Sequence, residues 1–445
     1  MNRIQPTTKP HELIKSSTNP HHSWLLRKLI STLNAANITA IHIVTKSGDR
    51  IAIGHPNSDV AAPVIKLKRN RAILKSSVNG LLGWAESYMA GDWECDSLIT
   101  LTDWAMYNED ALRTAFAGRS ISALINRIWH RLNDNSKRGS RKNIAYHYDL
   151  GNNFYQEWLD ETMTYSSALF EDTSLTLAQA QNAKYQRILS MSEAKSGDRI
   201  LEIGCGWGGF AETVSEHDRL SLYGVTLSKE QLAYANHRVA QLEANNRIKL
   251  AFQDYRDIDQ TFERIVSIEM FEAVGEAHWD TYFQKLYTSL KPGGTAVLQI
   301  ICIEPKRFEN YRNNADFIQR YIFPGGMLPT AEKVMDLTQA HGMHMEEQLE
   351  FGLDYAETLR QWRETFMQRW ESIKPQGYDE RFKRMWEYYL AYCESGFRYR
   401  SIDVRLFKIR KPLCSSLLSS TQTQKQGAPN ANTTPHSVPT HGHHG

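Results

Sequence analysis

The 445-residue chain has 41% hydrophobic residues, a formal net charge of +2 and a mean hydropathy of −0.51, which is typical of a globular protein with a full core. No apolar run reaches the roughly 18 residues that cross a bilayer, and the N-terminus lacks the apolar stretch of a secretory signal peptide. The five cysteines show no C-x-x-C or metal-ligand spacing, which predicts reduced thiols, a cytoplasmic location and no metal site.

Charge is distributed unevenly along the chain. Residues 1–150 carry 20 Lys and Arg against 12 Asp and Glu, whereas residues 151–445 carry 32 against 38. A basic first third beside an acidic remainder suits an anionic surface better than nucleic acid, which favours clustered basic charge and a higher pI. We therefore expect no nucleic-acid partner.

The first third of the chain predicts a small α+β domain over residues 23–134, after a polar, disordered segment 1–22. Residues 38–55 predict two strands around a Ser-Gly-Asp turn. Residues 97–118 and 121–132 predict helices, because their apolar residues recur at helical spacing. A basic linker, residues 135–143, follows this domain.

Residues 144–411 alternate between strand and helix patterns, which predicts an α/β domain with a Rossmann-like, doubly wound parallel sheet. Residues 290–294, "LKPGG", predict the turn into the last of these strands, and residues 412–445 form a polar tail that we expect to be disordered. The expected strands span residues 199–204, 220–227, 248–253, 264–269 and 295–303.

The loop "LEIGCGWGGF", residues 201–210, contains two ligand-binding patterns at once. Its G-x-G-x-x-G spacing is typical of a dinucleotide site, whereas Glu202 with the alternating glycines is typical of an S-adenosylmethionine site. An NAD site typically has an Asp or Glu at the end of the second strand to bind the ribose hydroxyl, but residues 224–228 contain neither. Asp254 can accept from an adenine amine and Tyr255 can stack on the ring, so the sequence favours S-adenosylmethionine over NAD.

Seven motifs together make the chain resemble the cyclopropane-fatty-acyl-phospholipid synthases, whose close cousins are the mycolic-acid methyltransferases. The motifs occupy residues 146–170, 201–209, 224–231, 253–257, 271–275, 321–329 and 388–400. The resemblance implies a class I S-adenosylmethionine-dependent methyltransferase fold over the larger domain. It implies that the cofactor is bound by Tyr165, Ser166, Glu202, Gly204, Cys205, Gly206, Gly208, Thr226, Gln231, Asp254, Tyr255 and Arg256.

The resemblance also implies the reaction: a methyl group passes from S-adenosylmethionine to the cis double bond of an unsaturated phospholipid acyl chain. The resulting carbocation loses a proton to a bound bicarbonate ion, and a cyclopropane ring closes. The residues implied for the catalytic site are Glu272, Gln299, Tyr355, the backbone amides of Ser167 and Ile301, and Cys393. We expect Cys393 to be a packed residue, since this chemistry needs no thiol.

Three positions depart from the family pattern. Ser167 replaces a Cys that contributes only its backbone, Ala273 replaces a His, and Gln299 replaces the His expected to hold bicarbonate. Gln299 cannot become a cation, so a charge-assisted bond is lost. The alternatives are therefore a methyltransferase that yields a methyl-branched unsaturated chain, or a catalytically silent lipid- or cofactor-binding homologue. For Glu272, the alternative is that it caps a helix.

A double bond inside a lipid requires the protein to work at a phospholipid membrane surface, peripherally on the inner membrane. Helix 121–132, with Lys137, Arg138, Arg141 and Lys142, is a candidate contact with anionic lipid. The alternative is that this helix packs between the two domains and the linker is merely solvated. The N-terminal domain is expected to serve lipid docking or the contacts of a homodimer.

Overall fold

The structure is a computed structural model that describes residues 22–116, 136–137, 139–140, 143, 150–242, 245–314 and 316–413. The expected helix 121–132, the linker residues 135, 138, 141 and 142, and nearly all of the two expected disordered ends lie outside the described residues. Lys137, which was expected to contact anionic lipid, is described and pairs with Asp257. Within the described ranges, no helix combines the length and apolar character that crossing a bilayer requires.

The N-terminal unit contains a four-stranded sheet in the order β2-β1-β3-β4. The two strands predicted within residues 38–55 are present as the antiparallel pair β1 and β2, and β3 runs parallel to β1. The strands are β1 (Ile41–Val44), β2 (Arg50–Ile53), β3 (Val64–Leu67) and β4 (Trp93–Cys95). The helices are α1 (Trp24–Ala35), α2 (Arg71–Met89), α3 (Leu98–Tyr107) and α4 (Glu109–Phe116).

A seven-stranded sheet in the order β10-β11-β9-β8-β5-β6-β7 forms the larger unit. The strands are β5 (Arg199–Ile203), β6 (Ser221–Thr226), β7 (Ile248–Phe252), β8 (Phe262–Ile268), β9 (Leu290–Ile303), β10 (His344–Glu350) and β11 (Ile402–Arg410). All five predicted strands are present. Two details differ: β9 already begins at Leu290, where a turn was expected, and β11 is antiparallel to both β9 and β10.

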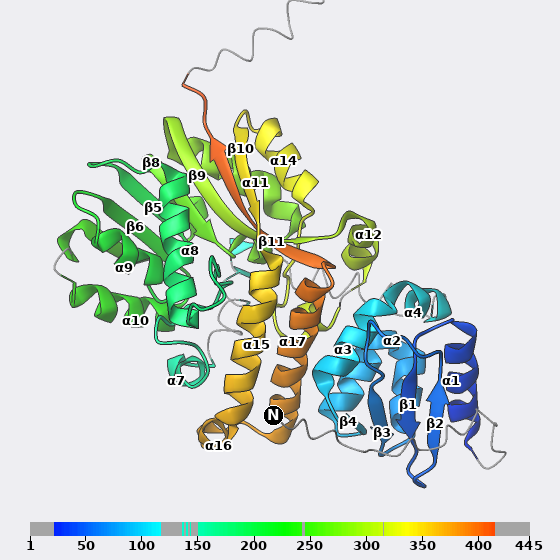
Figure 1. The fold of residues 1–445 in the computed structure, drawn as a ribbon. Helices are drawn as coiled ribbons and strands as arrows, with labels where there is room; N and C mark the ends of the chain where they lie inside the picture. The colour runs from blue at the N-terminus through cyan, green and yellow to red at the C-terminus, as the bar shows by residue number, and fades with distance from the viewer. Residues whose placement is uncertain are drawn as a thin grey trace, which may run out of the picture.

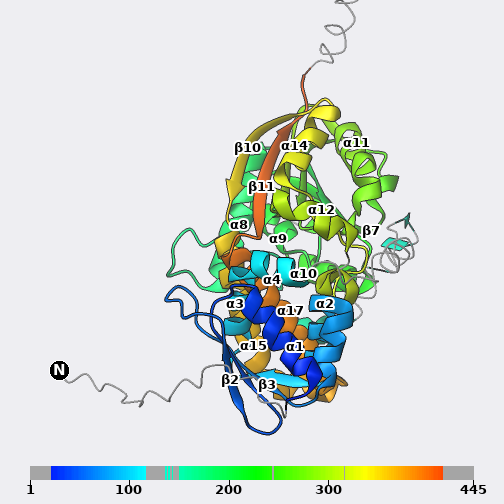
Figure 2. The same cartoon turned by 90° about the vertical axis from the view of Figure 1, so that its right-hand side faces the viewer.

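Helices cover both faces of this sheet, as the alternating pattern predicted (Figures 1 and 2). One face carries α8 (Leu177–Ser192), α9 (Gly209–Ser215) and α10 (Lys229–Ala240), and the other carries α11 (Trp279–Ser289) and α14 (Ala331–Ala340). Shorter helices are α7 (Asn152–Gln156), α12 (Pro305–Asn313), α13 (Phe317–Tyr321) and α16 (Trp370–Ile373).

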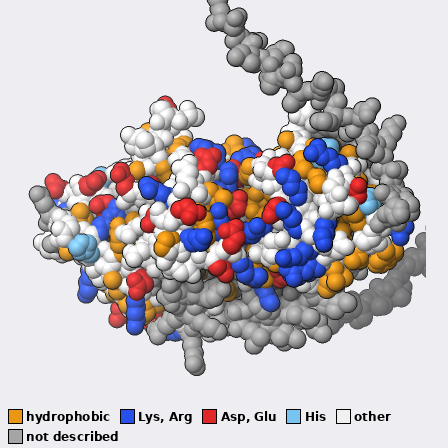
Figure 3. All heavy atoms as spheres, turned by 90° about the horizontal axis from the view of Figure 1, so that it is seen from below, with side chains coloured by type: hydrophobic (Ala, Val, Ile, Leu, Met, Phe, Trp, Pro, Cys, Tyr) orange, Lys and Arg blue, Asp and Glu red, His pale blue; other side chains and the backbone are white. Residues whose placement is uncertain are grey.

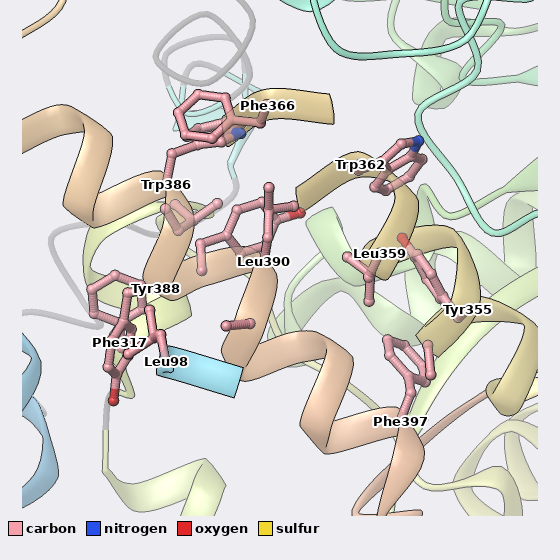
Figure 4. Packing of buried hydrophobic residues seen from close by; sticks show 14 of the residues in the cluster. Leu98, Phe317, Tyr355, Leu359, Trp362, Phe366, Trp386, Tyr388, Leu390 and Phe397 are labelled. Carbon is pink, nitrogen blue, oxygen red and sulfur yellow. The ribbon is translucent and has the colours of Figure 1, made fainter. Parts of the chain in front are cut away.

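Two long helices, α15 (Gly352–Gln368) and α17 (Glu380–Arg398), lie side by side between the large sheet and the N-terminal unit (Figure 1). Aromatic side chains pack along both helices: Figure 4 shows Phe366 of α15 near Trp386 of α17, and Trp362 farther along α15, and all three side chains are buried. Large aromatic rings supply much of a core's buried apolar area. Because α17 also packs against α2 and α3, and α15 against β11, the pair connects the two units.

Polar contacts join α17 to the N-terminal unit. The Tyr88 hydroxyl donates to Glu387 Oε2 at 2.7 Å, and Arg398 Nη1 donates to Asp103 Oδ2 at 2.6 Å. Because both pairs are partly shielded from water, they fix the orientation of α17 and, through it, of α15.

Candidate active site

A cavity opens at the carboxyl edge of the large sheet, where α/β sheets of this kind bind ligands. It is bordered by the ends of β5, β6, β7 and β8 and by the segment 163–166. Its lining residues are Met163, Thr164, Tyr165, Ser166, Tyr185, Glu202, Ile203, Gly204, Cys205, Gly206, Trp207, Gly209, Val225, Thr226, Leu227, Gln231, Gln253, Tyr255, Ile268, Glu269, Met270 and Ala273.

The glycine-rich loop leaves its backbone open to this cavity. Gly206 has a φ of 50°, and no atom lies within 4 Å of the position a Cβ would take there. The amides of Gly204 and Cys205 both donate to the carbonyl of Val225, which ties the loop to β6. Gly208, with a φ of 84°, is the N-cap of α9 and packs on Ala235 rather than lining the cavity. The loop is thus fixed, with free backbone facing the space a ligand would fill.

Glu202 is the acid of the predicted cofactor motif. Its side chain is 3% exposed and, in the described part of the chain, Oε2 has no hydrogen-bond partner. Burial raises the pKa of this carboxyl to about 8. A buried acceptor without a donor at a cavity wall suits a cationic ligand group, such as the ammonium of S-adenosylmethionine. The residues here therefore fit that cofactor.

Only some of the residues predicted to contact the adenosine line the cavity. Thr226 and Gln231 line the cavity and hydrogen-bond to each other at 3.1 Å, and Tyr255 also lines it. Asp254 and Arg256 do not line it; instead, Arg256 binds both oxygens of the Asp254 carboxylate, at 2.8 and 2.7 Å. Gln253, which was not predicted, takes the place next to Tyr255. We infer that Asp254 and Arg256 support this wall from behind.

The segment that carries Tyr165 and Ser166 rests on a buried lysine that sequence reasoning missed. Lys184 is fully buried, and its Nζ donates to Ser166 Oγ at 2.7 Å. Burial lowers the pKa of Lys184 to about 7, an effect opposed by Glu269, Asp160 and Glu202. The burial of Lys184 could have been predicted from the sequence, because this residue falls on the apolar face of the helical pattern 177–192.

At the end of β8, the Glu269 carboxylate accepts three hydrogen bonds from residues predicted to hold an anion. Oε1 accepts from the Ser167 amide at 2.8 Å and from Gln299 Nε2 at 2.7 Å, and Oε2 accepts from the Tyr355 hydroxyl at 2.7 Å. The Ser167, Gln299 and Tyr355 side chains are buried, whereas Glu269 is partly open and lines the cavity. Burial raises the pKa of Glu269, and the three donors and Lys184 oppose the rise.

The fourth predicted donor is also occupied. The Ile301 amide donates to Glu272 Oε1 at 2.6 Å, and Glu272 Oε2 is buried with no partner among the described residues. Burial and the nearby charge of Glu269 raise the pKa of Glu272 to about 8. Glu272 therefore neither lines the cavity nor caps a helix; it pairs with a neighbouring strand.

These bonds correct the expected bicarbonate site. The donors assigned to that ion, namely Ser167, Gln299, Tyr355 and Ile301, are all paired with protein carboxylates. A bicarbonate ion at these donors would have to displace the Glu269 and Glu272 carboxylates or lie next to them, and neighbouring negative charges repel. The residues present do not fit the ion as predicted.

Helix α15 fixes the geometry around Glu269. Thr358 Oγ1 accepts from the Ala168 amide at 3.1 Å, and Asp354 Oδ2 accepts from the Phe170 amide at 2.9 Å. These two bonds hold the segment that presents the Ser167 amide. Asp354 directly precedes Tyr355 on α15, and Thr358 follows it by about one turn. Cys393 lies outside the cavity and packs on the aromatic core, where burial raises the pKa of its thiol.

The sheet order with its antiparallel β11, the glycine loop after β5 and the cavity at the carboxyl edge define a class I S-adenosylmethionine-dependent methyltransferase. Within that class, residues 135–407 match the family model described as mycolic acid cyclopropane synthetase. The chain belongs to this family, and the resemblance found in the sequence motifs is confirmed.

Named relatives agree with this assignment. The chain is 39% identical over 358 residues to the tuberculostearic acid methyltransferase of Mycobacterium tuberculosis, covering 78% of this chain and 83% of the relative. It is 38% identical over 342 residues to the cyclopropane-fatty-acyl-phospholipid synthase of Escherichia coli, covering 74% and 82%. The crystal structure of the mycolic acid cyclopropane synthase CmaA1 with SAH and CTAB is similar, with a TM-score of 0.57 and 29% identity, covering 61% and 98%.

Proposed function

We propose that this protein transfers a methyl group from S-adenosylmethionine to the cis double bond of an unsaturated phospholipid acyl chain and closes a cyclopropane ring. The observation that carries the proposal is a single cavity in which the Glu202 glycine loop and the Glu269 carboxylate face the same space. A cofactor bound at the loop and the Glu269 carboxylate can therefore both reach the same part of a substrate in this cavity.

The cofactor-binding roles follow from the cavity wall. Glu202 accepts from the ammonium group, the open backbone at Gly206 admits the amino-acid end, and Tyr255, which lines the same cavity, stacks on the adenine. When bound, S-adenosylmethionine supplies an electrophilic methyl group that an alkene can attack. The chain's own contribution is to hold the double bond in line and to exclude water.

Aromatic rings beside the cavity can stabilise positive charge on the acyl chain. Tyr165 lines the cavity, and its ring centroid lies 5.3 Å from that of Trp362, which in turn lies 6.1 Å from Tyr355. A desolvated cation above such a ring gains about 2 kcal/mol. The same rings are apolar, so they also suit a hydrocarbon chain.

A second candidate product is a methyl-branched unsaturated chain, formed when the proton leaves a chain carbon instead of the transferred methyl. The observation that favours it is Gln299, a neutral residue where the family pattern has His. The similarity to a methyltransferase named for tuberculostearic acid supports it as well. Both candidates share the cofactor, the alkene and the loss of one proton.

Docking on a phospholipid surface is part of this proposal, and α2 supports it. Leu74 and Val78 lie one helical turn apart, Leu81 follows a kink at Gly80, and the three are 51%, 55% and 64% exposed. Exposed apolar side chains such as these suit the boundary between lipid headgroups and acyl chains. On the face seen in Figure 3, Lys and Arg side chains are interspersed with Asp and Glu, and hydrophobic side chains gather toward the lower right. Apolar contact is therefore the expected main attraction.

The test uses purified protein, S-adenosylmethionine and phospholipid vesicles with cis-monounsaturated chains. We expect the acyl chains to gain one carbon, as measured by mass spectrometry after release of the fatty acids. Vesicles with fully saturated chains are the control and should gain none. Methylation of the headgroup, or of neither part, would contradict the proposal.

A further inference from the structure

The donors that would bind a catalytic anion converge on a carboxylate of the chain itself. Glu269 accepts from the Ser167 amide, Gln299 Nε2 and the Tyr355 hydroxyl at 2.8, 2.7 and 2.7 Å. Its own amide donates to the Gln299 carbonyl at 2.9 Å, which fixes the backbone beneath the side chain. An anion site is thus already built and already filled by Glu269.

The backbone at Glu269 is held in an unusual conformation. Its φ of 48° lies in the left-handed region that favours glycine. Strained residues of this kind persist where the surrounding structure over-determines them, and they cluster at functional sites. Here the strain turns the carboxylate off the end of β8 and into the cavity, beside Met270 and Tyr165.

The surroundings of Glu269 and Glu272 favour different protonation states for these two neighbouring carboxyl groups. Burial raises the pKa of Glu269, but its carboxylate accepts three hydrogen bonds, and these bonds and Lys184 favour its ionised form. Glu272 has one donor, the Ile301 amide, and an oxygen buried without a partner among the described residues, which favours its protonated form. Opposite protonation of two adjacent acids is the usual arrangement in which one of them acts as a base.

We infer that Glu269 is the general base of this protein and that its carboxylate takes the place of a bound bicarbonate ion. This inference rests on the proposed function. After the alkene has gained the methyl group, a C–H bond of that methyl or of an adjacent chain carbon breaks. Its electron pair forms the last ring bond or a new double bond. The proton passes to Glu269 Oε2, which carries only the Tyr355 bond, and the acid later returns it to water.

The first test compares the wild type with Glu269→Gly and Glu269→Gln in buffer stripped of carbon dioxide, then with millimolar bicarbonate. We expect the wild type to turn over equally in both. Both variants should lose about 100-fold or more in kcat. Glu269→Gly removes the side chain and suits the positive φ, so bicarbonate should restore about 10-fold or more of its lost rate, because the anion can then use the three vacated donors. Glu269→Gln should not recover.

The second test does not depend on lipid turnover. Calorimetric titration with bicarbonate, with S-adenosylhomocysteine present, should show binding to Glu269→Gly and none to the wild type. Binding of S-adenosylhomocysteine itself shows that each variant is folded, and Glu171→Gln, an exposed acid on the same segment as Ser167, is the matched control. Bicarbonate-dependent turnover of the wild type, or near-normal turnover of Glu269→Gln, overturns the inference. If no protein turns over lipid, the proposed function fails while the titration still decides where the anion binds.

Discussion

The Tyr355 hydroxyl donates a hydrogen bond of 2.7 Å to Glu269 Oε2 and so links α15 to the end of β8. Tyr355 is buried, and its ring stacks on Phe397 with centroids 4.4 Å apart. The bond therefore has a rigid donor, and it orients the carboxylate toward the cavity.

Tyr355→Phe should lower kcat by about 10-fold or more, because it keeps the ring packing but leaves Glu269 with two donors and a looser position. The dissociation constant for S-adenosylmethionine should change by less than about twofold. Single-turnover kinetics and calorimetry measure the two quantities. Unchanged kcat would mean that the hydroxyl serves packing alone.

Glu202→Gln should weaken S-adenosylmethionine binding by about 10-fold or more, because the cofactor's ammonium favours the ionised carboxyl of Glu202 and the variant replaces this charge-assisted bond with a neutral one. Calorimetric titration of wild type and variant provides the measurement, and NAD should give no heat with either. If NAD bound to the wild type, the interpretation of the glycine loop would be wrong.

Lys184→Met should destabilise the protein by about 1–3 kcal/mol, since it leaves the buried Ser166 hydroxyl without its donor and removes the group that favours the ionised forms of Asp160, Glu202 and Glu269. Thermal melting with and without S-adenosylmethionine measures the loss. Lys195→Met, at an exposed position near the end of the same helix, is the control and should melt within about 0.5 kcal/mol of the wild type. Equal melting of the two variants would show that the buried charge is not needed.

Glu272→Gln tests the raised pKa of that carboxyl. The folded state holds its proton up to about pH 8, whereas the unfolded chain releases it near 4.5. The folded state thus binds more protons between these values, so stability falls as pH rises through this window, by at most about 1.4 kcal/mol per pH unit. In the variant this fall should be shallower, as measured by denaturant unfolding at pH 5 to 8, with kcat reduced less than about 10-fold. A loss of about 100-fold would return Glu272 to the reacting centre.

Much of the fold was predictable because its signals are local. The short apolar runs at 199–204, 220–227, 248–253 and 264–269 each predict a strand from neighbouring residues alone, and all four strands are present. β10 and β11 were not predicted. β10 alternates exposed with half-buried residues at the sheet edge, and its partner lies more than 50 residues away, so no local pattern specifies the pairing.

The site was only partly predictable from motifs. Tyr165, Ser166, Glu202, Thr226 and Gln231 line the cavity as expected. Glu269 was missed because it stands at the end of a strand, where an acid has no distinctive spacing. Its role appears only when the tertiary fold brings Ser167, Gln299 and Tyr355 around it. The pairing of Ile268 with Gln299 in the parallel register of β8 and β9 is what sets Glu269 beside Gln299.

The most direct test of the central claim uses S-adenosylmethionine with a fully deuterated methyl group and cis-monounsaturated phospholipid vesicles, in buffer stripped of carbon dioxide. The account predicts that the acyl chain gains one carbon carrying two of the three deuterium atoms, because the transferred methyl loses one of them to Glu269 on ring closure. Retention of all three would identify the methyl-branched product instead. Absence of label from the acyl chain, or labelling that requires added bicarbonate, would contradict the account.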